Sequence, residues 1–165
     1  MIGAVIQHHE MDPRFSGIIS SLHSALERLL AMAPMTTGTL PLRMPSSGVY
    51  LFSEGNRHLY VGRSNRLRSR IRRHGVETAK HNVAAFAFRL AREATGRTEA
   101  TYKTEGSRRQ LVQDPEFARA FLEAKARIRS MAVRYVEETD QLRQALLEIY
   151  AAVALETPYN DFDTH

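Results

Sequence analysis

Two short runs in the middle of the chain constrain its fold more than any other feature: GVYLF at 48–52 and HLYVG at 58–62. Both runs are rich in β-branched and aromatic residues, which favour extended strands. The segment between them contains Gly55 and Asn56, and these two residue types tolerate the positive φ of a tight turn. The pattern therefore predicts a β-hairpin.

The length of the hairpin loop decides whether Tyr50 and Tyr60 lie on the same face of the sheet, because side chains alternate along a strand. A three-residue loop at 54–56 pairs Ser53 with Arg57 and places both tyrosines on one face. A two-residue Gly-Asn turn sends them to opposite faces. The spacing alone leaves both arrangements open.

Two Asp-Pro pairs predict the starts of two long helices. Asp12-Pro13 and Asp114-Pro115 each place a side-chain cap directly before a proline, whose fixed φ suits the first helical position. Leucines and isoleucines recur at helical spacing after the first pair. A helix is therefore expected to about residue 33, followed by a linker to about residue 47.

Three more helices and one strand complete the predicted elements. Asn65 and Asn82 are expected to cap two short helices. Residues 130–137 are rich in apolar and aromatic side chains and predict a strand before the last helix. Either Thr139 or Asp140 is expected to cap that helix. Its apolar residues are expected to form one stripe, made of Leu142, Leu146, Ile149 and Val153.

The order helix, hairpin, helices, strand, helix predicts an α+β fold. A length of 165 residues suits one domain with appendages. We expect an N-terminal helical extension and linker over 1–40, and a main domain over 41–165 that carries a helical insertion at about 80–128. His8 and His9 are expected at the surface without a functional role.

Basic residues are concentrated in one short segment. The net charge is +5, and residues 57–74 contain seven arginines and no acid. Composition leaves nucleic acid, an acidic membrane surface and a solvated helix face open. Arginine in place of lysine favours phosphate, because the planar guanidinium can bind an oxyanion through two parallel hydrogen bonds. The arginines are Arg57, Arg63, Arg66, Arg68, Arg70, Arg72 and Arg73.

The chain contains no cysteine, which excludes disulfides, thiolate metal sites and cysteine nucleophiles and fits a reducing compartment. Any metal is therefore expected on oxygen or imidazole ligands. No apolar run approaches the ~20 residues that span a bilayer, and the apolar stretch at the N-terminus is too short for a signal peptide. The sequence predicts a soluble, cytoplasmic protein with no membrane partner.

Glu148 interrupts an apolar run. In ALLEIYAAVAL it is the only charged residue between Arg143 and Glu156. A carboxylate in such a helix is expected to be partly buried, and a buried carboxylate needs a partner. The simplest partner is an arginine in a buried salt bridge.

Arg70 and His74 are four residues apart on the predicted helix and are therefore neighbours on its surface. Both lie within roughly 60° of the inward-facing Leu67 and Ile71, so they border the buried side of that helix. Taken alone, the pair also fits a solvated basic face. In the same way, the two tyrosines taken alone fit aromatic packing on a small sheet.

An ordered set of residues resembles the GIY-YIG nuclease family. The set comprises GVY at 48–50, YVG at 60–62, Arg70, His74, Glu148 and the Pro-Tyr-Asn triplet that ends at Asn160. The resemblance covers roughly residues 46–160. A histidine four residues after the arginine is found in some restriction-type members of the family. The chain departs from the family pattern in having valine for isoleucine at both signature centres and in the insertion at about 80–128.

The resemblance implies a small three-stranded antiparallel sheet flanked by helices and a metal-dependent endonuclease activity on DNA. Products would carry 5′-phosphate and 3′-hydroxyl ends. Tyr50 is the expected base that activates water, Arg70 the clamp on the scissile phosphate, and Glu148 the single carboxylate ligand of Mg²⁺ or Mn²⁺. A free phenol has a pKa of about 10, so Tyr50 needs a neighbouring cation, either Arg63 or the metal.

The remaining expected site residues are Tyr60, His74 and Asn160. His74 would contact the phosphate or position the water, and Asn160 would hold the tyrosine or the glutamate. All six residues are expected to converge on one cleft, with side-chain tips within roughly 10 Å of a common point. The expected contacts to the DNA backbone are Arg63, Arg66, Arg68 and Arg73. The alternative is a GIY-YIG-fold module that binds nucleic acid without cutting it.

Overall fold

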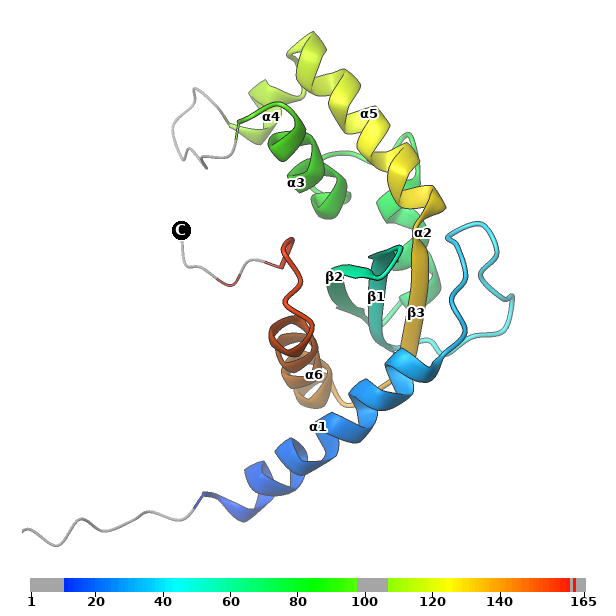
Figure 1. The fold of residues 1–165 in the computed structure, drawn as a ribbon, viewed down its shortest axis with the longest axis vertical. Coiled ribbons are helices and arrows are strands. Elements are labelled where there is room, and N and C mark those ends of the chain that lie inside the picture. The colour runs from blue at the N-terminus through cyan, green and yellow to red at the C-terminus, as the bar shows by residue number, and fades with distance from the viewer. Residues whose placement is uncertain (1–10, 98–106, 161, 163–165) are drawn as a thin grey trace, which may run out of the picture.

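The computed structural model describes residues 11–97, 107–160 and 162 (Figure 1). His8 and His9 lie outside these ranges. The predicted α+β fold is confirmed, with a three-stranded antiparallel sheet flanked by helices. The strands are β1 (Gly48–Glu54), β2 (Arg57–Ser64) and β3 (Ala132–Glu137). The helices of the described residues are α1 (Pro13–Ala31), α2 (Leu67–Gly75), α3 (Ala85–Ala94), α4 (Arg108–Leu111), α5 (Pro115–Ser130) and α6 (Gln141–Ala154).

Strand β1 lies at the centre of the sheet, with β2 on one side and β3 on the other. Side chains alternate between the two faces, so each face has its own core. Tyr50 and Phe52 belong to a core that also includes residues of α2, α3 and α5. Val49 and Leu51 belong to the core beneath α1 and α6. The sheet is therefore covered by helices on both faces.

Helices outside the predicted signature also contribute to these two cores. Helix α1 buries Leu22, Leu26 and Leu29 on one side. The predicted insertion at about 80–128 corresponds to α3, α4 and most of α5. The rings of Phe88 and Phe117 join α3 to α5, with centroids 5.0 Å apart. Among the described helices, none combines the length and the apolar composition that crossing a membrane requires.

The hairpin combines a two-residue turn with a bulge. Glu54 pairs with Arg57 across the turn, but Phe52 pairs with Tyr60, so Leu59 is an extra residue in β2. The bulge shifts the alternation by one position. Tyr50 and Tyr60 therefore share a face, with ring centroids 6.4 Å apart, although the short turn alone would separate them.

The aspartate caps are confirmed. Asp12 accepts hydrogen bonds from the first backbone amides of α1 at 3.0 Å. Asp114 accepts one from the amide of Phe117 in α5 at 2.9 Å. Of the two residues proposed to cap α6, Asp140 accepts from the amide of Arg143 at 2.8 Å. Each cap satisfies an amide that has no partner within its own helix.

The two asparagine caps are wrong. Helix α2 begins at Leu67 without a side-chain cap, because the Asn65 side chain accepts a hydrogen bond from Gln144 of α6 at 3.0 Å instead. Helix α3 begins at Ala85, after a turn in which the amides of residues 83 and 84 donate to the carbonyl of Lys80. Asn82 therefore precedes the helix by too many residues to cap it.

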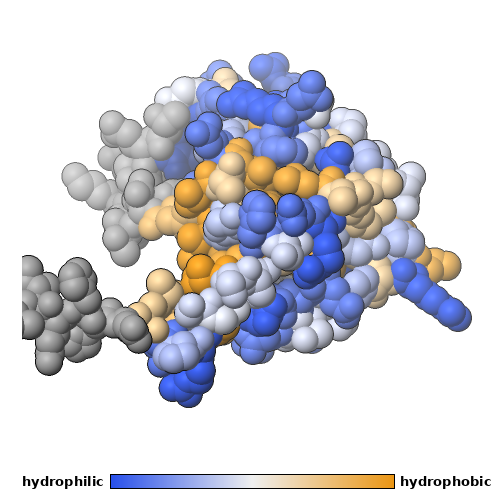
Figure 2. Space-filling model, turned by 60° about the horizontal axis from the view of Figure 1, so that its bottom comes forward, coloured by the Kyte–Doolittle hydropathy of each residue, from blue (hydrophilic) through white to orange (hydrophobic). Residues whose placement is uncertain are grey.

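The predicted apolar stripe of α6 does not form the buried face of that helix. Leu142, Ile149 and Val153 are 56%, 46% and 67% exposed. The buried side chains are instead Gln144, Leu147, Ala151 and Ala152. The small alanines permit a close approach of α6 to its neighbours, and the larger side chains on the other face remain at the surface. Figure 2 shows hydrophobic side chains at the surface when the bottom of the molecule in Figure 1 is brought forward.

Candidate active site

Tyr50 lies in the core of the sheet, directly over the neighbouring strand. Its side chain is 1% exposed. The Cα of Tyr50 is paired with that of Gly62 on β2, and a Cβ on this glycine would lie 2.4 Å from the Tyr50 hydroxyl. Glycine at this position therefore makes room for the phenol.

His74 holds the hydroxyl of Tyr50. The Tyr50 oxygen and Nε2 of His74 are 2.7 Å apart. Burial, followed by the charge of Arg70, lowers the pKa of His74 to about 3. The imidazole is therefore neutral at physiological pH, and one of its two nitrogens carries a hydrogen.

The tautomer of His74 decides which group donates: with the hydrogen on Nδ1, the Tyr50 hydroxyl donates to Nε2. Nδ1 of His74 is buried and has no hydrogen-bond partner. A hydrogen on Nδ1 would leave an N–H donor buried without an acceptor. A buried lone pair without a donor at Nδ1 costs less free energy. With the hydrogen on Nε2, the imidazole donates to the Tyr50 oxygen.

Arg70 lies beside both tyrosine hydroxyls. Its guanidinium is half-buried and donates to the carbonyl of Val83 at 2.8 Å. Burial raises the pKa of Tyr50 well above its usual value, and the neighbouring Tyr60 adds to the rise. Burial also raises the pKa of Tyr60. The charge and hydrogen bonding of Arg70 act in the opposite direction on both phenols.

Glu148 approaches this cluster from α6, which covers the other face of the sheet. The Nε of Arg63, a residue of the edge strand β2, donates to its Oε2 at 2.9 Å. A salt bridge to an arginine is therefore present, but it is partly exposed and not buried as the sequence predicts. Burial raises the pKa of Glu148, against the opposing effects of Arg63 and Arg70. The Glu148 side chain is 22% exposed and does not project into bulk solvent.

The expected residues come together to different extents. Tyr50, Tyr60 and His74 form one cluster of rings, with both tyrosine centroids within 5.5 Å of the imidazole. The charge of Glu148 is close enough to raise the pKa of both phenols and to lie in the field of Arg70. Tyr50, Tyr60 and Glu148 therefore all lie in the field of Arg70, which also acts on His74.

Asn160 supports this cluster through the backbone. Its Oδ1 accepts from the amide of Val61 and its Nδ2 donates to the carbonyl of the same residue, both at 2.8 Å. Thr157 donates to the same Oδ1 at 2.8 Å. The amide side chain thus imitates a neighbouring strand and holds β2 in place between Tyr60 and Gly62.

The four arginines expected on DNA differ in their surroundings. Arg63 forms the ion pair with Glu148, and Arg68 donates to the carbonyl of Pro41 at 3.2 Å. Arg66 and Arg73 are exposed. Arg63 is exposed as well, so three of the four reach solvent, and Arg63 and Arg68 have the contacts within the protein given above.

Sequence reasoning missed Phe86. Its ring stacks on that of Tyr60, with centroids 4.8 Å apart and planes at 10°. Phe86 is fully buried in α3 and also contacts the ring of Tyr159 near the C-terminus. The sequence shows it only as an apolar helix position, because the contact joins α3 to β2 and depends on the tertiary fold.

A metal ion has one carboxylate available at this site. Among the residues that the structure describes, no three His, Cys, Asp or Glu side chains come together as ligands. Glu148 offers hard oxygen donors beside the cluster, which suits Mg²⁺ or Mn²⁺, since these ions retain several waters and accept phosphate oxygens. The donor chemistry fits such an ion with a single protein ligand.

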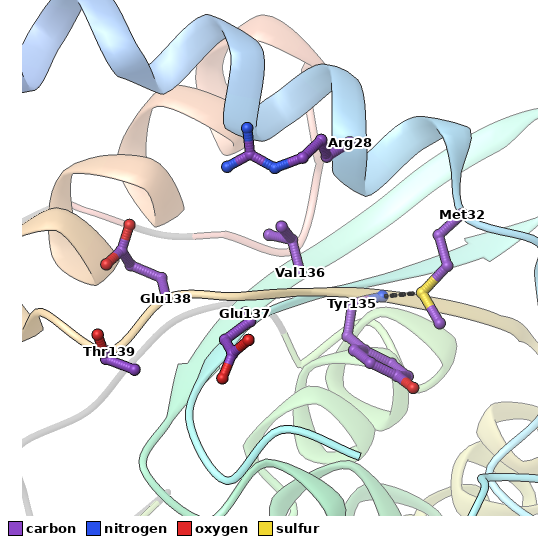
Figure 3. Close-up of a pocket in the computed structure, with 7 residues that line it drawn as sticks. All are labelled: Arg28, Met32, Tyr135, Val136, Glu137, Glu138 and Thr139. Atoms are coloured by element: carbon purple, nitrogen blue, oxygen red, sulfur yellow. Dashed lines mark hydrogen bonds between the residues drawn. The ribbon is translucent and has the colours of Figure 1, made fainter. Parts of the chain in front are cut away.

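A pocket of about 760 Å³ lies elsewhere in the fold, where α1 meets β3 and the chain that follows it (Figure 3). Arg28 and Met32 line it from α1, and residues 135–139 line it from the other side. The Tyr135 backbone amide donates to the Met32 sulfur at 3.1 Å. None of the six expected site residues lines this pocket.

Comparison of the chain with protein-family models, with curated proteins and with solved structures gives no match. The geometry of the cluster and the ordered sequence set are therefore the basis for a functional assignment.

Proposed function

We propose that this protein is a metal-dependent endonuclease of the GIY-YIG type, which hydrolyses DNA phosphodiester bonds and leaves 5′-phosphate and 3′-hydroxyl ends. The observation that carries the proposal is the Tyr50 hydroxyl held by His74 and Arg70, with the charge of Glu148 close by. A phenol, a guanidinium and a carboxylate supply a base, a phosphate clamp and a metal ligand in one place. The ordered sequence set supports the same assignment.

In the proposed reaction, the oxygen of a water molecule attacks phosphorus and the bond from phosphorus to the 3′ oxygen breaks. The water proton passes to Tyr50, which must first be a phenolate. The hydrogen bond from Arg70 favours the phenolate, and the Nε2–H tautomer of His74 would donate a second one to it. The departing 3′ oxygen takes a proton from solvent.

The protein alone keeps Tyr50 protonated, because burial raises the pKa of this phenol well above its usual value. Further positive charge is therefore needed near the phenol. A divalent ion on Glu148 would supply that charge and stabilise the leaving oxygen. Arg70 would bind a nonbridging phosphate oxygen, since its guanidinium is the cation beside both phenols.

DNA is the proposed partner because further exposed arginines lie on or next to α2, the helix that also carries Arg70 and His74. Arg66, Arg72 and Arg73 are all exposed on or next to α2. Arginines on one surface can neutralise successive phosphates, and the release of counterions then drives binding. We expect the affinity for DNA to fall steeply as salt concentration rises.

The second candidate is a GIY-YIG-fold module that binds DNA without cutting it. Two observations favour it: Arg63 already neutralises Glu148, and Tyr50 is 1% exposed. Incubation of the purified protein with single-stranded, duplex and branched DNA in Mg²⁺ or Mn²⁺ separates the two functions. A nuclease yields fragments with 5′-phosphate ends, whereas a binding module shifts the DNA in a gel and leaves every strand intact.

A further inference from the structure

The ion pair between Arg63 and Glu148 occupies the carboxylate that the proposed function assigns to the metal. Nε of Arg63 lies 2.9 Å from Oε2 of Glu148. A divalent ion bound to the Glu148 carboxylate would lie close to the Arg63 guanidinium. The two positive charges would repel each other. The two cations therefore compete for Glu148.

The two partners of this ion pair differ in how firmly they are held. Glu148 lies on α6 between Leu147 and a stretch that includes Ala151, which are 1% and 0% exposed. Its side chain is 22% exposed, whereas that of Arg63 is 44% exposed. Arg63 is also the second-last residue of β2. The guanidinium can therefore swing toward solvent while the carboxylate stays in place.

Arg63 belongs to the same basic segment as the exposed Arg66 and Arg73. A DNA backbone that crosses this segment brings phosphate oxygens to the partly exposed guanidinium. Phosphate can bind a guanidinium through two parallel hydrogen bonds, whereas the hydrogen bond to Glu148 uses only Nε of Arg63. A DNA phosphate is thus a strong competitor for Arg63.

We propose that Arg63 is a displaceable cation, which closes Glu148 to divalent metal in the free protein and transfers to a DNA phosphate when substrate binds. This inference rests on the proposed function, in which Glu148 is the metal ligand. Metal and DNA then bind with positive coupling. Metal on Glu148 frees Arg63 for a DNA phosphate, and a DNA phosphate on Arg63 frees Glu148 for the metal. The site loads its metal when a phosphate is in place.

The test measures Mn²⁺ binding to the full chain without DNA, by the loss of the free Mn²⁺ signal in electron paramagnetic resonance. The variants are Arg63→Gln and Glu148→Gln, with Arg66→Gln as a control that removes an equal charge from an exposed neighbour. Arg63→Gln is expected to bind Mn²⁺ about tenfold more tightly than wild type, within the usual range of coupling between sites. Arg66→Gln is expected to stay within about twofold, as for a screened surface charge. Glu148→Gln is expected to lose the site.

The outcomes separate this inference from the function on which it rests. If Glu148→Gln loses Mn²⁺ while Arg63→Gln binds it no more tightly than Arg66→Gln, the displacement of Arg63 is wrong and the metal ligand stands. If Glu148→Gln binds Mn²⁺ as wild type does, Glu148 is not the ligand, and both the proposed mechanism and the inference are overturned. Thermal unfolding of each variant identifies any loss of binding that follows from misfolding.

Discussion

The hydroxyl oxygen of Tyr50 lies 2.7 Å from Nε2 of His74, and neither side chain is more than 1% exposed. A buried phenol with a neutral imidazole and a guanidinium beside it is in an environment where small changes of charge decide whether it keeps its proton.

Replacement of Tyr50 by phenylalanine removes the proposed base and leaves the ring. DNA cleavage is expected to fall by about 10²- to 10⁴-fold, the usual contribution of a positioned base. Tyr150→Phe is the matched control, because Tyr150 also has a histidine partner, His23, at 3.0 Å in an exposed position. Single-turnover cleavage assays compare the two variants. Equal rates in both would exclude Tyr50 as the base.

His74 is expected to make the fold sensitive to acid. Its pKa is about 3 in the folded protein, whereas an unfolded histidine titrates near 6.5. As pH falls from 6.5 toward 3, the unfolded chain takes up a proton that the folded chain does not. The stabilisation that the neutral His74 provides is therefore fully present above pH 6.5 and is lost as pH falls toward 3, by about 5 kcal/mol in total at 1.36 kcal/mol per unit.

Chemical denaturation at a series of pH values measures this decline. The pH-dependent difference in unfolding free energy between wild type and His74→Gln is expected to follow the titration of one proton between pH 6.5 and 3. His23→Gln, on the exposed part of α1, is the control. Parallel stability curves for wild type and His74→Gln would show that His74 is protonated when folded.

Gly62→Ala is expected to disturb Tyr50 directly. A Cβ at this position would lie 2.4 Å from the Tyr50 hydroxyl, which is too close for any real contact. Overpacking of this kind typically costs about 1–3 kcal/mol. Gly17→Ala in α1 is the control: beyond the neighbouring backbone of its own helix, no atom lies within 4 Å of its added Cβ, so stability is expected to rise by about 0.5–1 kcal/mol. Thermal unfolding in which both substitutions are neutral would contradict the packing described for Tyr50.

Two neighbouring positions of α6 test which of its faces is buried. Leu147 is 1% exposed and Ile149 is 46% exposed. Truncation of Leu147 to alanine is expected to cost about 2–5 kcal/mol through lost burial and a cavity. Truncation of Ile149 is expected to cost under about 1 kcal/mol, since it removes partly exposed surface and improves helix propensity. The denaturant midpoints of the two variants give the order of their stabilities. A larger loss for Ile149→Ala than for Leu147→Ala would show that the apolar stripe predicted from the sequence is the buried face.

Local signals in the sequence predicted the parts of the fold that depend on neighbouring residues. The Asp-Pro pairs work because a cap and a fixed φ act within one turn of helix. The hairpin was predicted correctly because the strand preference of β-branched and aromatic residues depends on the residues of the strand itself. The same reasoning failed at Asn65, whose amide is taken by Gln144 from 79 residues away. The residues around Asn65 do not show that Gln144 competes with the helix amides for its side chain.

The sequence predicted the residues of the candidate site and their convergence on one cleft, but not the contacts that arrange them. The bulge at Leu59 decides that both tyrosines share a face, and the core on that side holds it in place. On α6, apolar residues surround most of the helix, so spacing alone cannot select the buried side. The partly buried state of Glu148 followed from its apolar context, whereas the identity of its partner, Arg63, required the crossing of α6 over β2.

The most direct test of the proposed nuclease is a paired measurement on Glu148→Gln, in which cleavage in Mg²⁺ and affinity for the same DNA are determined on one sample. Glu123→Gln, an exposed acid on α5, is the matched control. The account predicts that wild type and Glu123→Gln cut the DNA, while Glu148→Gln binds it with affinity within about threefold of wild type, because arginines provide the phosphate contacts. Glu148→Gln is expected to leave the strands intact. Cleavage by Glu148→Gln at the wild-type rate would contradict the account.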